Sequence, residues 1–568
     1  MRIKRSLVTP VMVAVLGLAS GGWLLQEGVD PQKNVYFQAR LLEEVIDHVS
    51  SQFVEDTERE QLYQMAIDGM LDELGDPHST FMTPEDYESL RMQTQGEYGG
   101  LGIEIDIRDG WLTVLSPLPN SPAERVGLMA GDRIIRVEGE STRDWTTDKA
   151  VSVLRGPKGS TVNITVNRLG VEEPIPFEIT RGEIELTAVP AAYMLTDDVG
   201  YIELTVFSTS ATDSLRYAIN RLRERGMESL VLDMRRNTGG LLEQGMSVAD
   251  LFLDRRQLVL ETRGRGPQQN QIFRASRGDQ FPDLELAVLV GPRSASATEI
   301  VAGALQDHDR AVLIGETSFG KGSVQTLFEL PGRNILKLTT ARWYTPSGRS
   351  IQKPYGIGSS ARALREDETG SVEIVPDDAR DVEEKREDDV PIYRTDAGRE
   401  VLGGGGITPD LIVRDTLTLA EQRLVQAIQG EWAVFNNLLY RYAVDYAHDH
   451  ELDPGFTVTE AMLDGFHRLL VSEGLEIERE VFDGAESFLA DRLANEISVA
   501  EFSREEGWKR LMQDDAQVRT AIELLQAAED AESLFALLPD YAARHELTLG
   551  AESHVDVMDG SGSAPHPF

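Results

Sequence analysis

The chain has 568 residues, enough for about four domains at roughly 150 residues each. Hydrophobic residues make up 41% and charged residues 27%, which excludes a mostly disordered chain and a polytopic membrane protein. The net charge of −41 makes the surface repel phosphate backbones, so we expect no nucleic-acid partner. The chain has no cysteine, which excludes a thiol nucleophile, a thiolate metal site and a thiol redox switch.

The N-terminus combines a basic start with an uncharged run. Three of the first five residues are basic, and residues 7–25 contain no charged residue. A helix over this run could just cross a bilayer, with the basic flank in the cytoplasm. Residues 1–33 thus predict either a membrane anchor, favoured by the apolar residues 23–25, or a signal peptide cleaved near the small residues 19–22, followed by a short linker. Both alternatives place the rest of the protein outside the cytoplasm.

Residues 34–92 predict a helical N-terminal segment. One apolar face recurs every four residues and consists of Leu41, Val45, Val49 and Phe53. Residues 93–182 then change to short strands, Gly-rich turns and two short helices. The first helix begins after Ser121, which caps it, with Pro122 in its first turn, and the second covers residues 146–154. We therefore expect a small β-domain after the helical segment.

Residues 183–415 alternate strands and helices, which predicts an α/β core. Three segments, residues 229–234, 286–290 and 311–314, are almost entirely apolar. Such runs are typical of strands in a sheet that is covered on both faces. The acidic stretch near residues 356–400 predicts a solvated insertion in this core.

Residues 416–550 predict a helical C-terminal domain. Thr457 and Glu460 have capping-box spacing and predict the start of one helix. The remaining residues, 551–568, are rich in Gly, Ser and Pro and predict a disordered tail. One helical face is formed by Leu424, Ile428, Phe435, Leu438 and Tyr442.

A turn of small residues, 291–296, joins the apolar strand 286–290 to a helix with an apolar inner face. A serine in this turn lies at a helix N-terminus, where free N–H groups and the helix dipole favour negative charge. That environment suits a nucleophile beside an oxyanion. A serine at a helix start is more often only a cap, so this pattern alone leaves both interpretations open.

A second segment, residues 315–325, reads GETSFGKGSVQ and follows the strand 311–314. Lys321 stands between Gly320 and Gly322, and glycines on both sides let the backbone pass close to another part of a site. A phosphate-binding loop is the alternative interpretation. Gly322 argues against it, because it stands where that motif requires Ser or Thr.

Several ordered strings resemble the C-terminal processing peptidases, which are exported serine proteases with a Ser–Lys dyad and a PDZ domain. In the core they are DMRRNTGG, SASATEI, ALQD and GETSFGKGSVQ. In residues 93–182, GGLGIEI, SPAERVGLMAGDRI and LRGPKGSTVNITV resemble a circularly permuted bacterial PDZ domain. The resemblance covers residues 34–415. It implies an α+β and α/β multidomain fold with a helical N-terminal segment, a PDZ domain (a small β-barrel with two helices), a crotonase-like α/β protease core over residues 183–415 and a helical C-terminal extension.

The resemblance implies that Ser296 is the nucleophile and that Lys321, 25 residues later, is the general base. It also implies that Gln325 orients the lysine amine. A serine hydroxyl becomes nucleophilic when a base takes its proton, and lysine is a base only when uncharged. We therefore expect burial to lower the pKa of this lysine by several units. A neutral glutamine suits this purpose, because a carboxylate beside the amine would raise that pKa.

The resemblance assigns the oxyanion hole to the backbone N–H of Ala297 together with that of Gly239 or Gly240. Thr238 stands where the family usually has proline, which leaves this loop freer and the choice between the two glycines open. Two acidic residues occupy supporting positions, and we expect them to be structural or to act from behind the site: Asp307 and Glu299.

The Gly-rich turn of the PDZ domain and the strand after it can hold a terminal carboxylate and pair with a peptide. The resemblance implies that Arg155 couples peptide binding to the active site. The backbone candidates for the peptide groove are Gly100, Leu101, Gly102 and Ile103.

These interpretations predict the partners and the compartment. We expect protein or peptide substrates with apolar C-termini, no cofactor and no metal, and a location on the periplasmic side of a bacterial inner membrane. The membrane is contacted only through the N-terminal segment, and a homo-oligomer is compatible with the sequence.

Two other functions compete with this one. A catalytically inactive PDZ adaptor on a protease scaffold is the main alternative, and the presence of Ser296, Lys321 and Gln325 argues against it. An acyl-CoA enzyme of the crotonase type would share only the α/β core.

Overall fold

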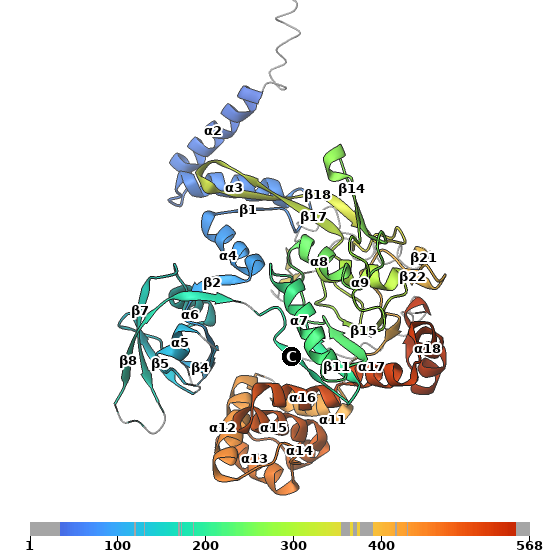
Figure 1. Ribbon diagram of the computed structural model, residues 1–568. Helices are drawn as coiled ribbons and strands as arrows, with labels where there is room; N and C mark the ends of the chain where they lie inside the picture. The colour runs from blue at the N-terminus through green and yellow to red at the C-terminus, as the bar shows by residue number, and fades with distance from the viewer. Residues whose placement is uncertain are drawn as a thin grey trace, which may run out of the picture. The chain divides into compact units, whose positions relative to one another are not determined.

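The computed structural model describes residues 35–353 and 390–552, apart from short gaps at 109, 119–120, 130, 169–170, 172, 186, 415–416 and 429, and two short strands between these stretches (Figure 1). The predicted anchor or signal peptide, most of the predicted acidic insertion and nearly all of the predicted tail lie outside the described residues. No helix in the described ranges combines the length and hydrophobicity of a membrane span. The chain divides into an N-terminal unit (residues 1–82, 327–338 and 355–377) and a main unit (the remainder).

The N-terminal unit contains two helices, a strand pair and a short hairpin. Strand β1 (Thr80–Met82) runs antiparallel to the first residues of β18 (Ile335–Tyr344). The helices are α2 (Val35–Gln52) and α3 (Arg59–Asp72). The apolar face predicted at Leu41, Val45, Val49 and Phe53 is not buried: Leu41 and Val45 are about half exposed (48% and 50%), and the buried residue of α2 is Ile46. Within the described residues, this small unit offers too little structure to cover both helices. Its two-stranded hairpin, β19 (Leu364–Glu366) with β20 (Val372–Ile374), is antiparallel.

The first part of the main unit is the predicted small β-domain. Its sheet has the order β3-β4-β5-β7-β8, and all neighbouring pairs are antiparallel. Ser121 caps α5 by accepting a hydrogen bond from Glu124 N–H, as predicted, and Thr146 caps α6, the helix that the sequence predicted over residues 146–154. The elements are α4 (Pro84–Gln95), β2 (Glu97–Gly100), β3 (Ile103–Arg108), β4 (Trp111–Pro117), α5 (Pro122–Arg125), β5 (Arg133–Val137), β6 (Glu140–Ser141), α6 (Thr147–Leu154), β7 (Thr161–Asn167), β8 (Ile175–Thr180) and β9 (Gly182–Glu185).

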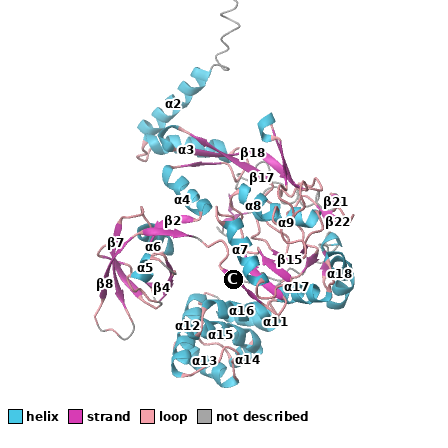
Figure 2. Ribbon diagram, viewed as in Figure 1, coloured by secondary structure: helices cyan, strands magenta, loops and turns pink. Residues whose placement is uncertain are grey.

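The centre of the main unit is a seven-stranded sheet of order β10-β11-β12-β15-β16-β23-β24, of which β11 and β15 are labelled in Figure 2. The strands from β11 to β23 are parallel, and β10 and β24 are antiparallel edges. The three predicted apolar strands are confirmed as β12, β15 and β16. The strands are β10 (Ala191–Met194), β11 (Val199–Glu203), β12 (Ser229–Asp233), β15 (Glu285–Val290), β16 (Val312–Gly315), β23 (Leu411–Ile412) and β24 (Thr548–Leu549).

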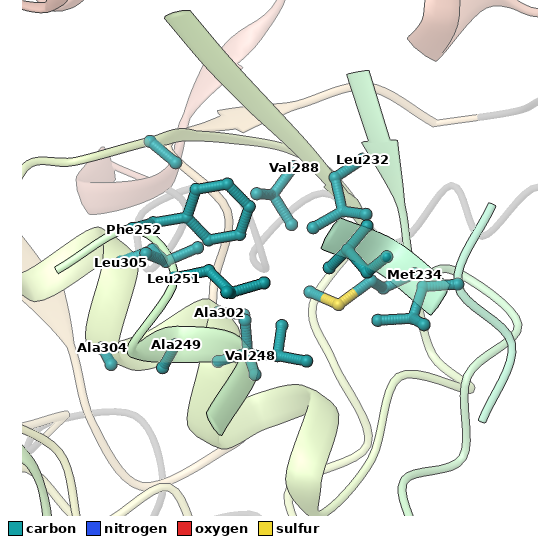
Figure 3. Packing of buried hydrophobic residues seen from close by; sticks show 14 of the residues in the cluster. Leu232, Met234, Val248, Ala249, Leu251, Phe252, Val288, Ala302, Ala304 and Leu305 are labelled. Carbon is teal, nitrogen blue, oxygen red and sulfur yellow. The ribbon is translucent and has the colours of Figure 1, made fainter. Parts of the chain in front are cut away.

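Helices cover both faces of this sheet. On the first face, Leu230 and Leu232 pack with α7 (Ala211–Arg223), α8 (Leu242–Ala249) and α9 (Ala297–Asp307), as Figure 3 shows for part of this cluster. On the second face, Val231 belongs to a cluster that includes α17 (Ala516–Ala527) and α18 (Ala531–His545). The alternation along β12 places neighbouring residues on opposite faces, as expected for a strand buried on both sides.

A second set of strands completes the core. The last residues of β18 pair with β13, which also pairs with β14. The remaining core elements are β13 (Leu258–Gly264), β14 (Gln271–Arg274), β21 (Ile392–Arg394), β22 (Glu400–Leu402) and the 3₁₀ turns η2 (Pro267–Gln269) and η4 (Gly550–Glu552). Strand β17 (Ser323–Glu329) begins in the main unit, and its last residues and the turn η3 (Pro331–Arg333) belong to the N-terminal unit.

Within the described residues, six helices form a C-terminal bundle over residues 419–514, so the helical domain predicted for residues 416–550 is divided, because α17 and α18 pack on the sheet instead. The single helical face predicted over residues 424–442 is divided between the first two helices of this bundle, but its residues Leu424, Ile428 and Phe435 are fully buried in the core of the bundle. The predicted capping box is wrong: Thr459, not Thr457, caps α13 because its hydroxyl accepts the Met462 N–H. The helices are α11 (Leu419–Ile428), α12 (Trp432–Asp449), α13 (Glu460–Ser472), α14 (Arg479–Gly484), α15 (Glu486–Glu501) and α16 (Arg504–Asp514).

Candidate active site

The predicted nucleophile turn joins β15 to α9. Ser296, the last residue before α9, has φ 58° and ψ −114°, a conformation that a residue with a side chain rarely adopts. The other serine of this turn, Ser294, is fully buried; its hydroxyl donates to Met234 O (2.9 Å) and accepts from Gly291 N–H (3.0 Å). Ser294 is therefore structural, and the half-buried Ser296 remains as the serine at the helix N-terminus.

The carboxylate of Glu299 joins this turn to the lysine loop. Its Oε2 accepts the backbone N–H of Ser296 (2.8 Å) and of Lys321 (2.9 Å). Its Oε1 accepts the hydroxyl of Ser318 (2.6 Å) and the N–H of Gly320 (2.7 Å). Burial raises the pKa of Glu299, and the four hydrogen bonds, which favour the ionised form, partly offset that rise. A single buried carboxylate thus fixes the two predicted catalytic residues to each other.

Hydrogen bonds from two side chains fix the backbone around Lys321. The side chain of Gln352 accepts the Gly322 N–H (3.0 Å) and donates to Gly320 O (3.3 Å), while Trp343 Nε1 donates to Lys321 O (3.2 Å). Gly322 packs so tightly that a Cβ there would lie 3.0 Å from the Gln352 backbone nitrogen. The glycines beside the lysine therefore allow close packing, as the sequence predicted, and the lysine side chain itself is half-buried.

Gln325 lies on β17, four residues after the lysine. Its amide nitrogen donates to Ser323 Oγ (2.9 Å) and to Thr339 Oγ1 (3.3 Å). These contacts fix the amide plane. The predicted role of Gln325 in orienting the lysine amine stays a prediction.

The two candidate glycines of the oxyanion loop differ in their hydrogen bonds. Gly239 packs against the turn, since a Cβ there would lie 2.9 Å from Ser296 Cβ, and its N–H donates to Asn237 Oδ1 (2.9 Å). Among the hydrogen bonds of the described residues, none has the N–H of Gly240 or of Ala297 as donor. The geometry therefore favours Gly240 over Gly239 as the second donor beside Ala297.

Asp307 lies at the end of α9 in a fully buried ion pair. Its Oδ1 accepts from Arg349 Nη2 (2.8 Å), and its Oδ2 accepts the Ser347 N–H (2.9 Å). These bonds fasten the loop that contains Gln352. Asp307 thus acts on the loop behind the lysine rather than on Ser296.

Comparisons with known proteins agree with this geometry. The peptidase S41 family matches residues 198–359, a PDZ domain matches residues 89–167, and the N-terminal domain of the activating protease CtpB matches residues 25–86. The carboxy-terminal-processing protease of Bartonella bacilliformis is 41% identical over 331 residues, which are 58% of this chain and 75% of that protein. This chain belongs to the carboxy-terminal-processing proteases.

A second relative supports the same family, whose members are serine peptidases. The carboxyl-terminal-processing protease of a Synechocystis species is 39% identical over 302 residues, 52% of this chain and 69% of the relative. A solved PDZ domain of the carboxy-terminal protease from Vibrio cholerae, in complex with a peptide, is 32% identical and covers 16% of this chain and 99% of that domain, with a TM-score of 0.15.

The PDZ domain of this carboxy-terminal-processing protease presents an edge strand. Among the described strands, β3 pairs only with β4, and it begins at Ile103, directly after the Gly-rich turn. In that turn, the carbonyls of Leu101 and Gly102 accept hydrogen bonds from Ala123 and Leu118, which fixes the backbone. The guanidinium of Arg155 lies 4.4 Å from the ring centre of Tyr98, on the strand before the turn.

Sequence reasoning missed three side chains that hold the protease site together. Asn237 bonds to Leu204 O and Gly239 N–H through its side chain and to Ala295 N–H through its carbonyl. The other two are Gln352 and Trp343. Asn237 lies in the string DMRRNTGG, so the resemblance offered a signal for it, whereas Gln352 lies outside the strings given above. A lone buried tryptophan on a strand offered none.

Proposed function

We propose that this protein is a serine endopeptidase that cuts other proteins near their C-termini, with Ser296 as nucleophile and Lys321 as general base. One observation carries the dyad: Ser296 N–H and Lys321 N–H donate to the same oxygen of Glu299, at 2.8 and 2.9 Å. The two backbone nitrogens therefore lie no further apart than the sum of these two hydrogen-bond lengths. A lysine side chain that begins so close is long enough to reach the serine hydroxyl.

In the proposed reaction, the Ser296 hydroxyl adds to the carbonyl carbon of the scissile peptide and gives its proton to the neutral Lys321 amine. The resulting tetrahedral intermediate collapses when the C–N bond breaks and the lysine ammonium returns the proton to the leaving amine. Water then adds to the acyl-enzyme ester with the lysine again as base, and breaking the ester bond restores Ser296 and releases the new C-terminus.

The oxyanion of each intermediate lies at the N-terminus of α9 in this proposal. Ala297 N–H is the first donor of that helix, and the helix dipole adds positive potential there. Gly240 N–H supplies the second bond. A donor of this kind contributes on the order of 3 kcal/mol to the transition state.

We propose that the PDZ domain captures the substrate's terminal carboxylate at the Gly-rich turn, with apolar last residues beside β3. The free edge of β3 and the fixed turn support this mode, in which a peptide adds a strand to a sheet. We also propose export of the protein, with the body on the periplasmic side of the inner membrane. The basic start and the uncharged residues 7–25 support that location.

Cleavage of an unfolded test protein by residues 34–568 tests the activity. Wild type is expected to cut, and Ser296→Ala and Lys321→Ala are each expected to abolish cutting while the fold is kept. Ser294→Ala is the matched control, because it removes the other hydroxyl of the same turn and is expected to cut when folded. An inactive wild type that still binds peptides would favour the PDZ adaptor instead. A fully active lysine variant would overturn the dyad.

Substrate capture needs a separate test. A protein substrate whose C-terminal carboxylate is amidated is expected to show a several-fold higher KM than the same substrate with a free carboxylate, with kcat much less affected. Equal KM values for the two forms would contradict capture of the terminus by the PDZ domain.

A further inference from the structure

The loop that carries Gly239 and Gly240 begins at Arg235, and this arginine contacts the C-terminal extension. Its Nε and Nη2 bond to Asp233 at the end of β12, the shortest at 2.6 Å. Its Nη1 donates to Asp515 Oδ2 (2.6 Å) and to Gln517 Oε1 (3.0 Å), which lie at the start of α17. The guanidinium is thus shared between the sheet and a helix near the end of the chain.

The Asp233–Arg235 pair is a buried, ionised pair. Burial tends to raise the pKa of Asp233, but the charge and hydrogen bonds of Arg235 outweigh it and lower that pKa. Tyr201 adds a hydrogen bond to the same carboxylate (2.8 Å). Asp233 binds the Nε and Nη2 side of the guanidinium, and the acceptors of Nη1 lie at the start of α17, so the orientation of Arg235 depends on Asp515 as well.

Asp515 has two functions at once. Its Oδ1 caps α17 by accepting the N–H groups of Gln517 and Val518 (2.9 Å each), which leaves Oδ2 for Arg235. Gln517 is anchored in turn, since its Nε2 donates to Val413 O (2.7 Å). The rest of α17 is fixed by apolar packing on the second face of the sheet, where Val518 and Leu524 are fully buried.

A short series of hydrogen bonds connects the loop that begins at Arg235 to the turn that contains Ser296. Asn237 follows two residues later, and its side chain bonds to Gly239 N–H and to Leu204 O. Its carbonyl accepts Ala295 N–H (3.2 Å) and the Thr298 hydroxyl (2.8 Å) on either side of Ser296. The loop is therefore fixed at Asn237 by the nucleophile turn and at Arg235 by α17.

We infer that α17 holds the oxyanion loop in its working geometry through Asp515 and Arg235, so that the C-terminal extension is a working part of the protease site and these two are positioning residues. The inference rests on the proposed hydrolysis for its catalytic consequence. The matched peptidase S41 segment ends at residue 359, so this contact comes from a part of the chain beyond that segment.

The test uses a variant that keeps the helix cap and removes the ion pair with Arg235, leaving the hydrogen bond from Arg235 Nη1 to the neutral side chain of Gln517. Serine caps helices well but is too short to hold Arg235 at the same time. Asp515→Ser is therefore expected to lower kcat about tenfold, part of the effect of losing an oxyanion donor, with KM changed by less than about twofold. Amide exchange of residues 236–241 is expected to rise about tenfold, while unfolding in urea stays close to wild type.

Asp530 provides the matched control, because it caps the neighbouring helix α18 without contacting Arg235. Asp515→Ala and Asp530→Ala each lose a cap and are expected to unfold at lower urea concentration, but only Asp515→Ala is expected to lose kcat. Wild-type kcat in folded Asp515→Ser, or unchanged exchange in residues 236–241, would overturn the inference. An inactive wild type would contradict the proposed function instead, and the exchange measurement would still decide whether α17 holds the loop.

Discussion

Both faces of the seven-stranded sheet are covered by buried apolar clusters, but the clusters are built from different parts of the chain. The first face is covered by α7, α8 and α9, which are local connections between strands, and α9 begins directly after Ser296. The second face is covered by α17 and α18, which lie near the end of the chain. The proposed active site lies at the first face. The helices on the second face contact the loop of that site through Asp515, at the start of α17.

This difference implies that stability and catalysis are only partly coupled. A defect on the first face displaces the helix whose N-terminus carries Ser296. A defect on the second face weakens the fold but reaches the site only if it changes the contact between α17 and Arg235. Three predictions test this difference between the two faces of the sheet.

The largest expected effect is at Glu299, on the first face. Glu299→Gln replaces one carboxylate oxygen by an N–H₂ group, which faces donors instead of accepting from them. We expect kcat/KM to fall by on the order of 100-fold and the free energy of unfolding to fall by about 3 kcal/mol. Cleavage assays and urea unfolding measure the two quantities.

Glu243→Gln is the control for that variant, since Glu243 is an exposed acid in the first turn of α8. It is expected to leave both quantities unchanged. If folded Glu299→Gln cut substrate at the wild-type rate, the carboxylate bridge would have no role in the site.

The intermediate effect concerns two substitutions, one on each face of the sheet, that each create a cavity. Leu305→Ala on α9 and Leu524→Ala on α17 remove fully buried side chains of the same size, and each is expected to cost about 3 kcal/mol of unfolding free energy. We expect only Leu305→Ala to lower kcat several-fold in the folded protein, because it shifts the helix that carries Ser296. Equal losses of kcat in the two variants would contradict the difference proposed between the two faces.

The smallest effect concerns the acidic residues that precede α17. Burial, together with the charges of Asp514 and Glu421, raises the pKa of Asp491 to about 6. The folded state therefore binds more protons than the unfolded state between about pH 4 and pH 6, since a free aspartate has a pKa of about 3.9. Stability from this group is present at low pH and is lost as the pH rises through about 6.

Asp491→Asn is expected to flatten this part of the stability curve, as measured by urea unfolding at pH 5 and pH 7.5. The exposed Asp445 of α12 is the control, and Asp445→Asn is expected to keep the wild-type difference between the two pH values. An unchanged pH dependence in Asp491→Asn would show that another group is responsible.

Much of the fold and of the candidate site follows from local patterns. The apolar runs predicted β12, β15 and β16 because a strand buried on both faces has no polar side, and the Gly-Lys-Gly pattern predicted close packing at Lys321. The partners of the lysine loop could not be predicted in this way. Gln352 and Trp343 reach it across more than twenty residues of sequence, and no periodicity encodes such pairs.

The contact between Arg235 and Asp515 was beyond sequence reasoning for the same reason, since 280 residues separate the two. The capping error at α13 has a different cause. Two threonines lie close together there, and only the three-dimensional start of the helix decides which hydroxyl meets a free N–H.

The most direct test of the central claim is covalent labelling of the nucleophile. Wild type is treated with a fluorophosphonate, which reacts with activated serines, and the modified residue is identified by peptide mass spectrometry. We expect labelling of Ser296 in wild type, none at Ser294, and loss of labelling in folded Lys321→Ala. Labelling of Ser296 at the wild-type rate in Lys321→Ala would contradict the Ser–Lys mechanism.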